Sequence, residues 1–172
     1  NGGTMTKLAN FYARAIIESG IEFDMLYGPA YKGIPLATAT VMSLYKLTSR
    51  EVPFAFNRKE AKDHGEGGLT VGAPLEGKVL IIDDVISAGT SVRESTEIIS
   101  ASDATLAGVV ISLNRKERGK GDRNAIDEVS ETLNVPVISI ASLDDIITLI
   151  KDDPEQAVWL EKINAYKDQY GA

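Results

Sequence analysis

The chain has 172 residues, of which 44% are hydrophobic and 25% are charged, so it is long enough for one globular domain with a sizeable core. It contains no cysteine, which excludes disulfides, thiolate metal sites and cysteine nucleophiles and fits a cytoplasmic location. The formal net charge of −7 argues against a general nucleic-acid binder, because phosphate contacts need a basic face. No run of about 20 apolar residues and no apolar leader occurs, so we expect no membrane insertion.

In chain order, the first half of the sequence predicts two helices and two strands. Apolar residues at helical spacing predict a helix over residues 4–19, which Gly20 ends. The short apolar run FDMLYG (23–28) predicts a strand, and IPLATATVMSLYKL (34–47) predicts the next helix. PFAFN (53–57) predicts a second strand, because proline is tolerated at the first position of a strand.

The middle of the sequence combines a polar segment with a strongly aliphatic strand. Residues 58–77 have no periodic apolar face, and we predict a mobile loop over about 59–73. The run KVLIID (78–83) predicts a buried strand. A helix is expected from about Ser91, where Ser91 and Glu94 have the spacing of a capping box.

Two more strands and two more helices are predicted in the last third. LAGVVISLN (106–114) and VPVISI (135–140) predict strands, with a helix over about 124–133 between them. SLDDIITL (142–149) predicts a helix start, so we assign its acidic pair, Asp144 and Asp145, to N-terminal capping. The tail over 153–170 is predicted to be helical.

The order of these elements predicts the fold class. Continuously aliphatic strands separated by helices indicate a parallel sheet that is buried on both faces. We therefore predict a single α/β domain over residues 1–172, doubly wound and Rossmann-like, with helices on both faces. In such sheets ligands bind beyond the carboxyl ends of the strands, near the switch in strand order.

The strongest candidate site follows the aliphatic strand, in DDVISAGTS (83–91). Asp83 and Asp84 suit vicinal hydroxyls or a hydrated Mg²⁺. The small and hydroxyl residues that follow, Ala88, Gly89, Thr90 and Ser91, bring backbone amides and a helix start that favour an anion. Together these groups describe a site for ribose 5-phosphate. The alternative, a strand end followed by an ordinary capped helix, stays open.

Three further segments present cations near predicted strand ends. YGPAYKGIP (27–35) places Lys32 in a tight turn that suits a diphosphate. NRKEAKDHGEGG (57–68) gathers the cations and the single histidine of a possible lid over an anionic leaving group: Arg58, Lys59, Lys62 and His64. Arg115, in LNRKERGKG (113–121), suits a bidentate pair with a substrate carboxylate. A plain turn or a solvated charged surface is the alternative for each segment.

Taken together, these motifs resemble a known family. VLIIDDVISAGTS (79–91) resembles the phosphoribosyl diphosphate signature of the type I phosphoribosyltransferases. FNRKEAKDHGEGG (56–68) and YGPAYKGIP narrow the resemblance to the orotate phosphoribosyltransferases of the bacterial type. The resemblance runs from about Phe11 to the end of the chain, with the three motifs in the order of the family.

The resemblance implies an enzyme and a set of roles. The reaction would convert orotate and 5-phosphoribosyl 1-diphosphate to orotidine 5′-monophosphate and diphosphate with Mg²⁺, a step of de novo UMP synthesis. Asp83 and Asp84 would hold the ribose hydroxyls, directly or through metal and water. The diphosphate would be bound by Tyr31, Lys32, Arg58 and Lys59, and orotate by Ser87 and Arg115. Lys62 and His64 would act from a mobile catalytic loop. The 5-phosphate would be bound by the residues that follow the acidic pair: Val85, Ile86, Ser87, Ala88, Gly89, Thr90 and Ser91.

The resemblance also implies an assembly and a difference from the family. The family forms homodimers in which the mobile loop reaches the active site of the neighbouring subunit. Its members carry an N-terminal hood over the orotate site, and this chain begins after the hood. We therefore expect a homodimer whose substrate pocket lacks the hood in this chain.

Two other functions are weighed against this one. Phosphoribosyltransferases for purines, uracil or xanthine share the Asp-Asp loop, but Arg115 and the basic lid favour a base that carries a carboxylate. A regulator of the same fold that senses phosphoribosyl diphosphate and binds nucleic acid should show a basic face outside the site, and the acidic composition argues against one.

Overall fold

A computed structural model of the chain describes residues 1–62, 68–87, 89–119 and 121–172. In these ranges six strands form one sheet in the order β3-β2-β1-β4-β5-β6. All neighbours pair in parallel except β2 and β3, which are antiparallel. The strands are β1 (Met25–Tyr27), β2 (Phe54–Lys62), β3 (Gly68–Gly72), β4 (Glu76–Asp83), β5 (Asp103–Asn114) and β6 (Val137–Ser142).

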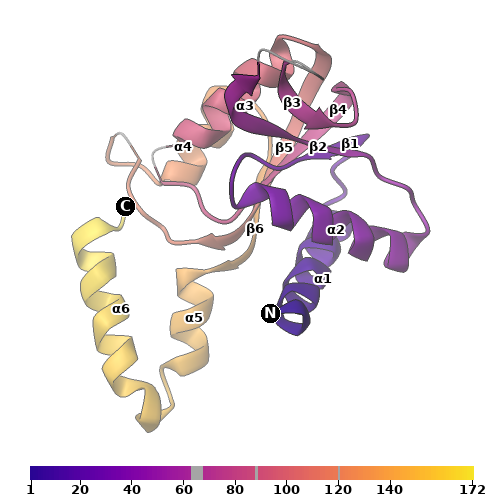
Figure 1. Cartoon of the computed structure of the whole chain (residues 1–172). Helices are drawn as coiled ribbons and strands as arrows, with labels where there is room; N and C mark the ends of the chain where they lie inside the picture. The colour runs from indigo at the N-terminus through magenta and orange to yellow at the C-terminus, as the bar shows by residue number, and fades with distance from the viewer. Residues whose placement is uncertain (63–67, 88, 120) are drawn as a thin grey trace.

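Helices cover both faces of this sheet, as the aliphatic strands predict (Figure 1). The helices are α1 (Gly2–Ser19), α2 (Gly33–Thr48), α3 (Thr90–Ser100), α4 (Ala125–Leu133), α5 (Leu143–Ile150) and α6 (Ala157–Tyr170), with a 3₁₀ turn, η1 (Pro154–Gln156), before α6. The predicted α/β class with a mainly parallel sheet is confirmed.

Strand β4 shows why the sheet needs cover on both sides. Its fully buried residues alternate between two cores: Val79 and Ile81 pack in one, Leu80 and Ile82 in the other. The first core also takes residues of α3 and α4, and the second takes residues of α1 and α2. Because successive side chains of a strand point to opposite faces, a strand that is apolar at every position stays buried only between two helical layers.

The predicted helix ends agree with local chemistry in most cases. Helix α1 ends at Gly20, whose φ of 67° is the left-handed conformation that glycine adopts without strain. Helix α4 begins after Asn124, whose side chain accepts a hydrogen bond from the backbone N–H of Ile126. Helix α5 begins with a capping box between Ser142 and Asp145, so the predicted capping role of this acidic region is confirmed.

The segment predicted as a mobile loop over about 59–73 is shorter than expected. Strand β2 continues to Lys62, and β3 pairs with it in antiparallel register, including Asn57 with Thr70 and Lys62 with Gly68. The prediction failed here because β3 is an edge strand, and an edge strand can form without the regular apolar alternation of a half-buried strand. The connection over residues 63–67 lies outside the described residues.

Helices α5 and α6 stand apart from the two helical layers. They pack against each other as an arm that extends away from the sheet, and the chain returns along α6 toward the sheet at its C-terminus (Figure 1). No residue of α6 is buried. Within the described ranges, no helix has the length and apolar character needed to cross a membrane.

Candidate active site

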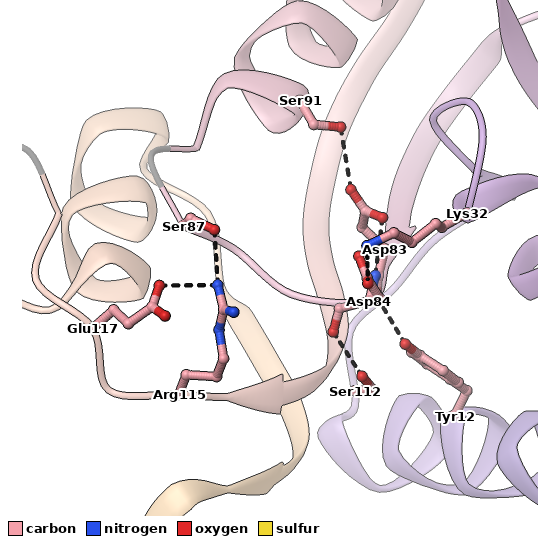
Figure 2. A network of polar contacts seen from close by, with 9 residues as sticks. All are labelled: Tyr12, Lys32, Asp83, Asp84, Ser87, Ser91, Ser112, Arg115 and Glu117. Carbon is pink, nitrogen blue, oxygen red and sulfur yellow. Dashed lines mark hydrogen bonds and ion pairs between the residues drawn. The ribbon is translucent and has the colours of Figure 1, made fainter. Parts of the chain in front are cut away.

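The carboxyl end of β4 places an acidic residue inside the protein. Asp83 is the last residue of the strand and only 8% exposed. Its Oδ1 accepts a hydrogen bond from the backbone N–H of Asp84 at 2.9 Å, and its Oδ2 accepts one from the Ser91 hydroxyl at 3.1 Å (Figure 2). Burial raises the pKa of Asp83, and the neighbouring Asp84 charge adds to that rise, while the hydrogen bond from the Asp84 backbone opposes it. The site therefore holds a carboxylate whose charge is only partly compensated.

Helix α3 begins beside this carboxylate without a side-chain cap. Its N-cap residue is Gly89, with a φ of 68°, and among the described residues no side-chain capping hydrogen bond forms there. The capping box predicted for Ser91 and Glu94 is therefore wrong, because Ser91 already lies inside the helix and turns its hydroxyl to Asp83. The uncapped N-terminus leaves backbone amides available to an anion.

A tight turn between β1 and α2 faces the same strand end. A Cβ on Gly28 would lie 2.2 Å from the carbonyl oxygen of Gly33, so only glycine allows the strand to approach the helix start this closely. The Asn57 side chain of β2 holds the turn, because its Oδ1 accepts a hydrogen bond from the Ala30 backbone at 2.7 Å. The turn therefore has a fixed place beside the carboxyl end of β4.

This turn delivers a lysine to the acidic pair. The Lys32 ammonium lies 2.6 Å from Oδ2 of Asp84, and this ion pair raises the pKa of Lys32 (Figure 2). The Lys32 side chain is 71% exposed and that of Asp84 33% exposed, so both remain accessible from solvent. An accessible ion pair of this kind is weak and can exchange partners with an incoming anion or cation.

A cavity of about 410 Å³ lies between the turn and the start of α3. Its volume falls within the roughly 300–1,000 Å³ of small-molecule sites. Ten of the predicted site residues line it, together with Pro29, Ala30 and Val92: Tyr31, Lys32, Asp83, Asp84, Val85, Ile86, Ser87, Gly89, Thr90 and Ser91. The first and second candidate segments of the sequence therefore meet in one site.

The fourth candidate segment forms a second cavity next to the first. Arg115 follows the carboxyl end of β5, and its Nη2 donates hydrogen bonds to the Ser87 hydroxyl at 2.8 Å and to Glu117 Oε2 at 2.9 Å (Figure 2). Ser87, Arg115 and Glu117 line a cavity of about 390 Å³. Because Ser87 lines both cavities, the predicted sugar-phosphate and base positions adjoin at this residue.

The remaining predicted residues are not brought together in the same way. Arg58 and Lys59 lie on β2 and do not line the first cavity among the described residues. Lys62 ends β2, and the position of its side chain is not described. His64 and Ala88 lie outside the described residues. The assignments of these five residues stay predictions.

Three supporting residues could not be found from the sequence motifs. The Tyr12 hydroxyl of α1, fully buried, donates a hydrogen bond to the Asp83 carbonyl at 2.8 Å. The Ser112 hydroxyl of β5 donates one to the Asp84 carbonyl at 2.7 Å. Asn57 holds the opposite turn. Each contact joins residues at least 27 positions apart, which no local pattern reveals.

The acidic pair has the donor chemistry for Mg²⁺ together with a ligand. Magnesium prefers carboxylate oxygens and is usually held by one or two carboxylates plus substrate phosphates. The Lys32 ammonium at Asp84 shows that this carboxylate accepts a cation where the cavity opens. Among the described residues, no group of three or more acidic, histidine or cysteine side chains is placed to hold a metal ion, so a metal here would need ligand oxygens as well.

Comparisons with known proteins show the family of the chain. A family model of the phosphoribosyl transferase domain matches residues 1–143. The chain is 60% identical over 171 residues to the orotate phosphoribosyltransferase of Laribacter hongkongensis and 56% identical over 171 residues to that of Thiobacillus denitrificans; each match covers 99% of this chain and 80% of the relative. The crystal structure of orotate phosphoribosyltransferase from Francisella tularensis has a TM-score of 0.86 and 37% identity, covering 100% of this chain and 82% of that one.

The sheet, the acidic strand end and the uncapped helix define the protein as one with a phosphoribosyl transferase domain. At 56–60% identity over almost the whole chain, the relatives identify the group within that class. The chain belongs to the orotate phosphoribosyltransferase family of transferases.

Proposed function

We propose that this chain transfers ribose 5-phosphate from 5-phosphoribosyl 1-diphosphate to orotate, which yields orotidine 5′-monophosphate and diphosphate in de novo UMP synthesis. The observation that carries the proposal is the pair of cavities that adjoin at Ser87. One holds the acidic pair and a helix N-terminus, and the other holds Arg115. A sugar phosphate and a carboxylated base in these two cavities would meet at their boundary.

The chemistry follows from the charges around the first cavity. The bond between the anomeric carbon and the diphosphate oxygen breaks, and diphosphate leaves with the electron pair. A ring nitrogen of orotate forms the new bond and loses its proton. The anomeric carbon gains cationic character on the way, and the carboxylates of Asp83 and Asp84 are fixed next to the sugar position to stabilise it.

Lys32 would exchange one partner for another during this step. In the structure its ammonium pairs with Asp84. A diphosphate carries more negative charge than one carboxylate, so its arrival would draw Lys32 toward the leaving group and release Asp84 to the ribose hydroxyls or to a metal. Tyr31 lies in the same turn and would contact the diphosphate there, together with Arg58 and Lys59 from β2.

The 5-phosphate would lie at the start of α3. The helix N-terminus supplies backbone amides, and six described residues from Val85 to Ser91 line the first cavity: Val85, Ile86, Ser87, Gly89, Thr90 and Ser91. This assignment leaves Ser87 at the boundary, where its hydroxyl also faces the base position through Arg115.

Mg²⁺ is proposed as the cofactor, held by Asp83 and Asp84 directly or through water. The ion would supply positive charge to the leaving diphosphate. Both oxygens of Asp83 already accept hydrogen bonds from Asp84 and Ser91, which favours a water-mediated role for Asp83 and a more direct one for Asp84. Calorimetric titration of Mg²⁺ in the presence of phosphoribosyl diphosphate, compared between the wild-type chain and Asp84→Asn, tests this assignment.

A homodimer with shared sites and a cytoplasmic location complete the proposal. Lys62 and His64 would act from the loop of one subunit on the site of the other. Lys62→Ala and Asp84→Asn variants, each inactive alone, should regain about a quarter of the wild-type activity when mixed as equal, randomly associating subunits, because one of the two sites in each heterodimer is then intact. Mixing without recovery would show that each subunit completes its own site.

The decisive experiment follows ultraviolet absorbance at the orotate band with this chain, orotate, phosphoribosyl diphosphate and Mg²⁺. Loss of absorbance that depends on all three additions, with orotidine 5′-monophosphate as product, is the expected result. Uracil, hypoxanthine and xanthine replace orotate in parallel reactions. Turnover of one of these bases but not of orotate would overturn the proposed function.

A further inference from the structure

The segment after β5 is held by the distant C-terminus of the chain. Arg118 donates two hydrogen bonds to the end of α6: its backbone N–H donates to the Tyr170 carbonyl at 2.8 Å, and its Nη2 donates to the Gln169 carbonyl at 2.7 Å. The backbone N–H of Ala172 donates a third, to the Lys116 carbonyl at 3.0 Å. Helix α6 buries no residue and lies outside the two helical layers. Its described backbone contacts with the rest of the domain therefore concentrate at the loop that carries Arg115.

A chain of side chains runs from this helix into the second cavity. The Tyr166 hydroxyl of α6 donates a hydrogen bond to Oε1 of Glu117, and Oε2 of the same carboxylate accepts one from Arg115 Nη2 at 2.9 Å. The Glu117 side chain is 15% exposed and that of Arg115 is 31% exposed, so the ion pair is largely shielded from solvent. The bond to Glu117 raises the pKa of Tyr166, which keeps its hydroxyl protonated as the donor.

We propose that Glu117, itself fixed by Tyr166, is a positioning residue that orients the Arg115 guanidinium for the carboxylate of the base. The proposal rests on the proposed function, since it concerns how the same site selects a carboxylated base. Glu117 and Tyr166 line the second cavity and not the first, so we expect both to act on the base end of the site.

The free donors of Arg115 support this role. All hydrogen bonds of Arg115 to described residues leave from Nη2, which is shared by Ser87 and Glu117. Its Nε is buried and has no hydrogen-bond partner in the described part of the chain. A buried donor without a partner is rare in proteins, so the described part of the chain leaves this guanidinium incompletely satisfied. With Nη2 anchored on two sides, the planar guanidinium has one orientation in which to present its other donors.

The arrangement also explains why a second carboxylate near Arg115 need not compete with the substrate. Glu117 accepts from one nitrogen of the guanidinium and turns its other oxygen to Tyr166, so it fixes the guanidinium plane, while Nη1 makes no hydrogen bond to a described residue. A preoriented arginine loses less conformational freedom when it binds a carboxylate. We therefore expect Tyr166 and Glu117 to affect orotate binding and to leave the binding of phosphoribosyl diphosphate unchanged.

The first test substitutes Tyr166→Phe, which removes the hydroxyl and keeps the ring. The KM for orotate should rise roughly 5- to 20-fold, a part of the roughly 10- to 150-fold that a hydrogen bond to a charged group is worth, because Tyr166 acts only through Glu117; the KM for phosphoribosyl diphosphate should stay within about twofold. Tyr45→Phe is the matched control: Tyr45 lies on α2, outside both cavities, and its hydroxyl makes no hydrogen bond to a described residue. The control should leave the KM for orotate unchanged.

A double-substitution cycle shows whether Tyr166 acts through Glu117. Glu117→Gln should also raise the KM for orotate. In the double variant, the KM for orotate should exceed that of Glu117→Gln by less than about twofold, because the two groups form one chain to Arg115. Thermal unfolding of each variant accompanies the kinetics. A parallel rise in both KM values with a lowered melting temperature would reduce the two residues to a structural role and overturn the proposal.

The failure of this proposal differs from that of the proposed function. If the wild-type chain turns over orotate and Tyr166→Phe matches it in the KM for orotate, positioning by Glu117 is wrong and the enzyme assignment stands. If the wild-type chain turns over a base without a carboxylate and rejects orotate, both fail together. Full independence of the Tyr166→Phe and Glu117→Gln effects in the cycle also contradicts the proposal.

Discussion

Two of the three Asp-Asp pairs in the chain, Asp83-Asp84 and Asp144-Asp145, are used differently by the fold. Asp83 and Asp84 end a buried strand, where the first is 8% exposed and bonded to Ser91 and the second pairs with Lys32. Asp144 and Asp145 begin an exposed helix, where the first pairs with Lys167 and the second forms a capping box. Each pair therefore has one lysine and one serine partner, yet both residues of the first pair line the candidate active-site cavity, whereas of the second pair only Asp144 lines a cavity, a separate one.

The physical difference lies in solvation. Burial raises the pKa of Asp83, so its ionised form is less stable than it would be in water. The hydrogen bonds from the Ser142 hydroxyl and backbone lower the pKa of Asp145, so its ionised form is stabilised. A carboxylate that folding stabilises serves the fold, whereas a carboxylate that folding strains is available for a ligand.

The largest expected difference between the pairs is in turnover. Asp84→Asn should lower kcat/KM for orotate by about 100- to 1,000-fold, because a fixed charge next to the developing cation is lost. Asp144→Asn removes the corresponding exposed carboxylate and should leave kcat/KM unchanged. Steady-state kinetics with matched thermal melts measure both. Equal losses in the two variants would show that the acidic pair at β4 has no special place in the reaction.

The lysine partners extend the comparison. Lys32→Met should lower kcat/KM by about 10- to 100-fold, since the leaving diphosphate loses one cation. Lys167→Met removes the ion pair with Asp144, whose length of 2.7 Å is close to the 2.6 Å of the pair between Lys32 and Asp84. The pair of Lys167 is exposed and does not line the first cavity, so turnover should not change. Inhibition by added diphosphate should weaken in Lys32→Met only. An unchanged inhibition constant there would remove Lys32 from the leaving-group site.

The two pairs also show how far sequence reasoning reaches. The aliphatic run before Asp83 and the SLDD start before Asp144 are local signals, and both predicted the right element, a strand end at the first pair and a helix start at the second. The contacts that fix Asp83 and Asp84 come from Tyr12 and Ser112, which lie 71 and 28 positions away, and no local pattern specifies such contacts. The same limit hid Tyr166, which lies 49 positions from Glu117.

Sequence reasoning was wrong where two local rules competed. Ser91 and Glu94 have capping-box spacing, but Gly89 begins the helix two residues earlier and leaves the Ser91 hydroxyl for Asp83. The polar stretch after Arg58 has no regular pattern, yet part of it pairs as the edge hairpin of β2 and β3. In both places the tertiary surroundings selected the structure, because the local preferences there are weak.

Substitutions of the two serine partners should give a smaller difference, in which one serine affects mainly stability and the other mainly turnover. Ser142→Ala removes the N-cap of α5 and should lower the free energy of unfolding by about 1 kcal/mol without changing turnover. Ser91→Ala removes the hydroxyl that holds Asp83 and should change turnover more than stability, since α3 has no side-chain cap to lose. Chemical denaturation and kinetics on both variants check this exchange. A stability loss in Ser91→Ala equal to that in Ser142→Ala would make Ser91 a structural residue.

The smallest expected effect is a difference in the pH dependence of stability, measured in metal-free buffer. The pKa of Asp83 is raised by folding, so its stabilising contribution is complete below the unfolded pKa near 3.8 and is lost as the pH rises through its folded pKa. Asp83→Asn should therefore be more stable than the wild-type chain at neutral pH, with the advantage disappearing in acid.

The pKa of Asp145 is lowered, so its contribution is present above pH 3.8 and is lost as the pH falls through its folded pKa. Asp145→Asn should be less stable than the wild-type chain at neutral pH and should approach it in acid. Urea denaturation at several pH values measures both slopes, and slopes of the same sign would contradict the assignment of one pair to ligand binding and the other to the fold.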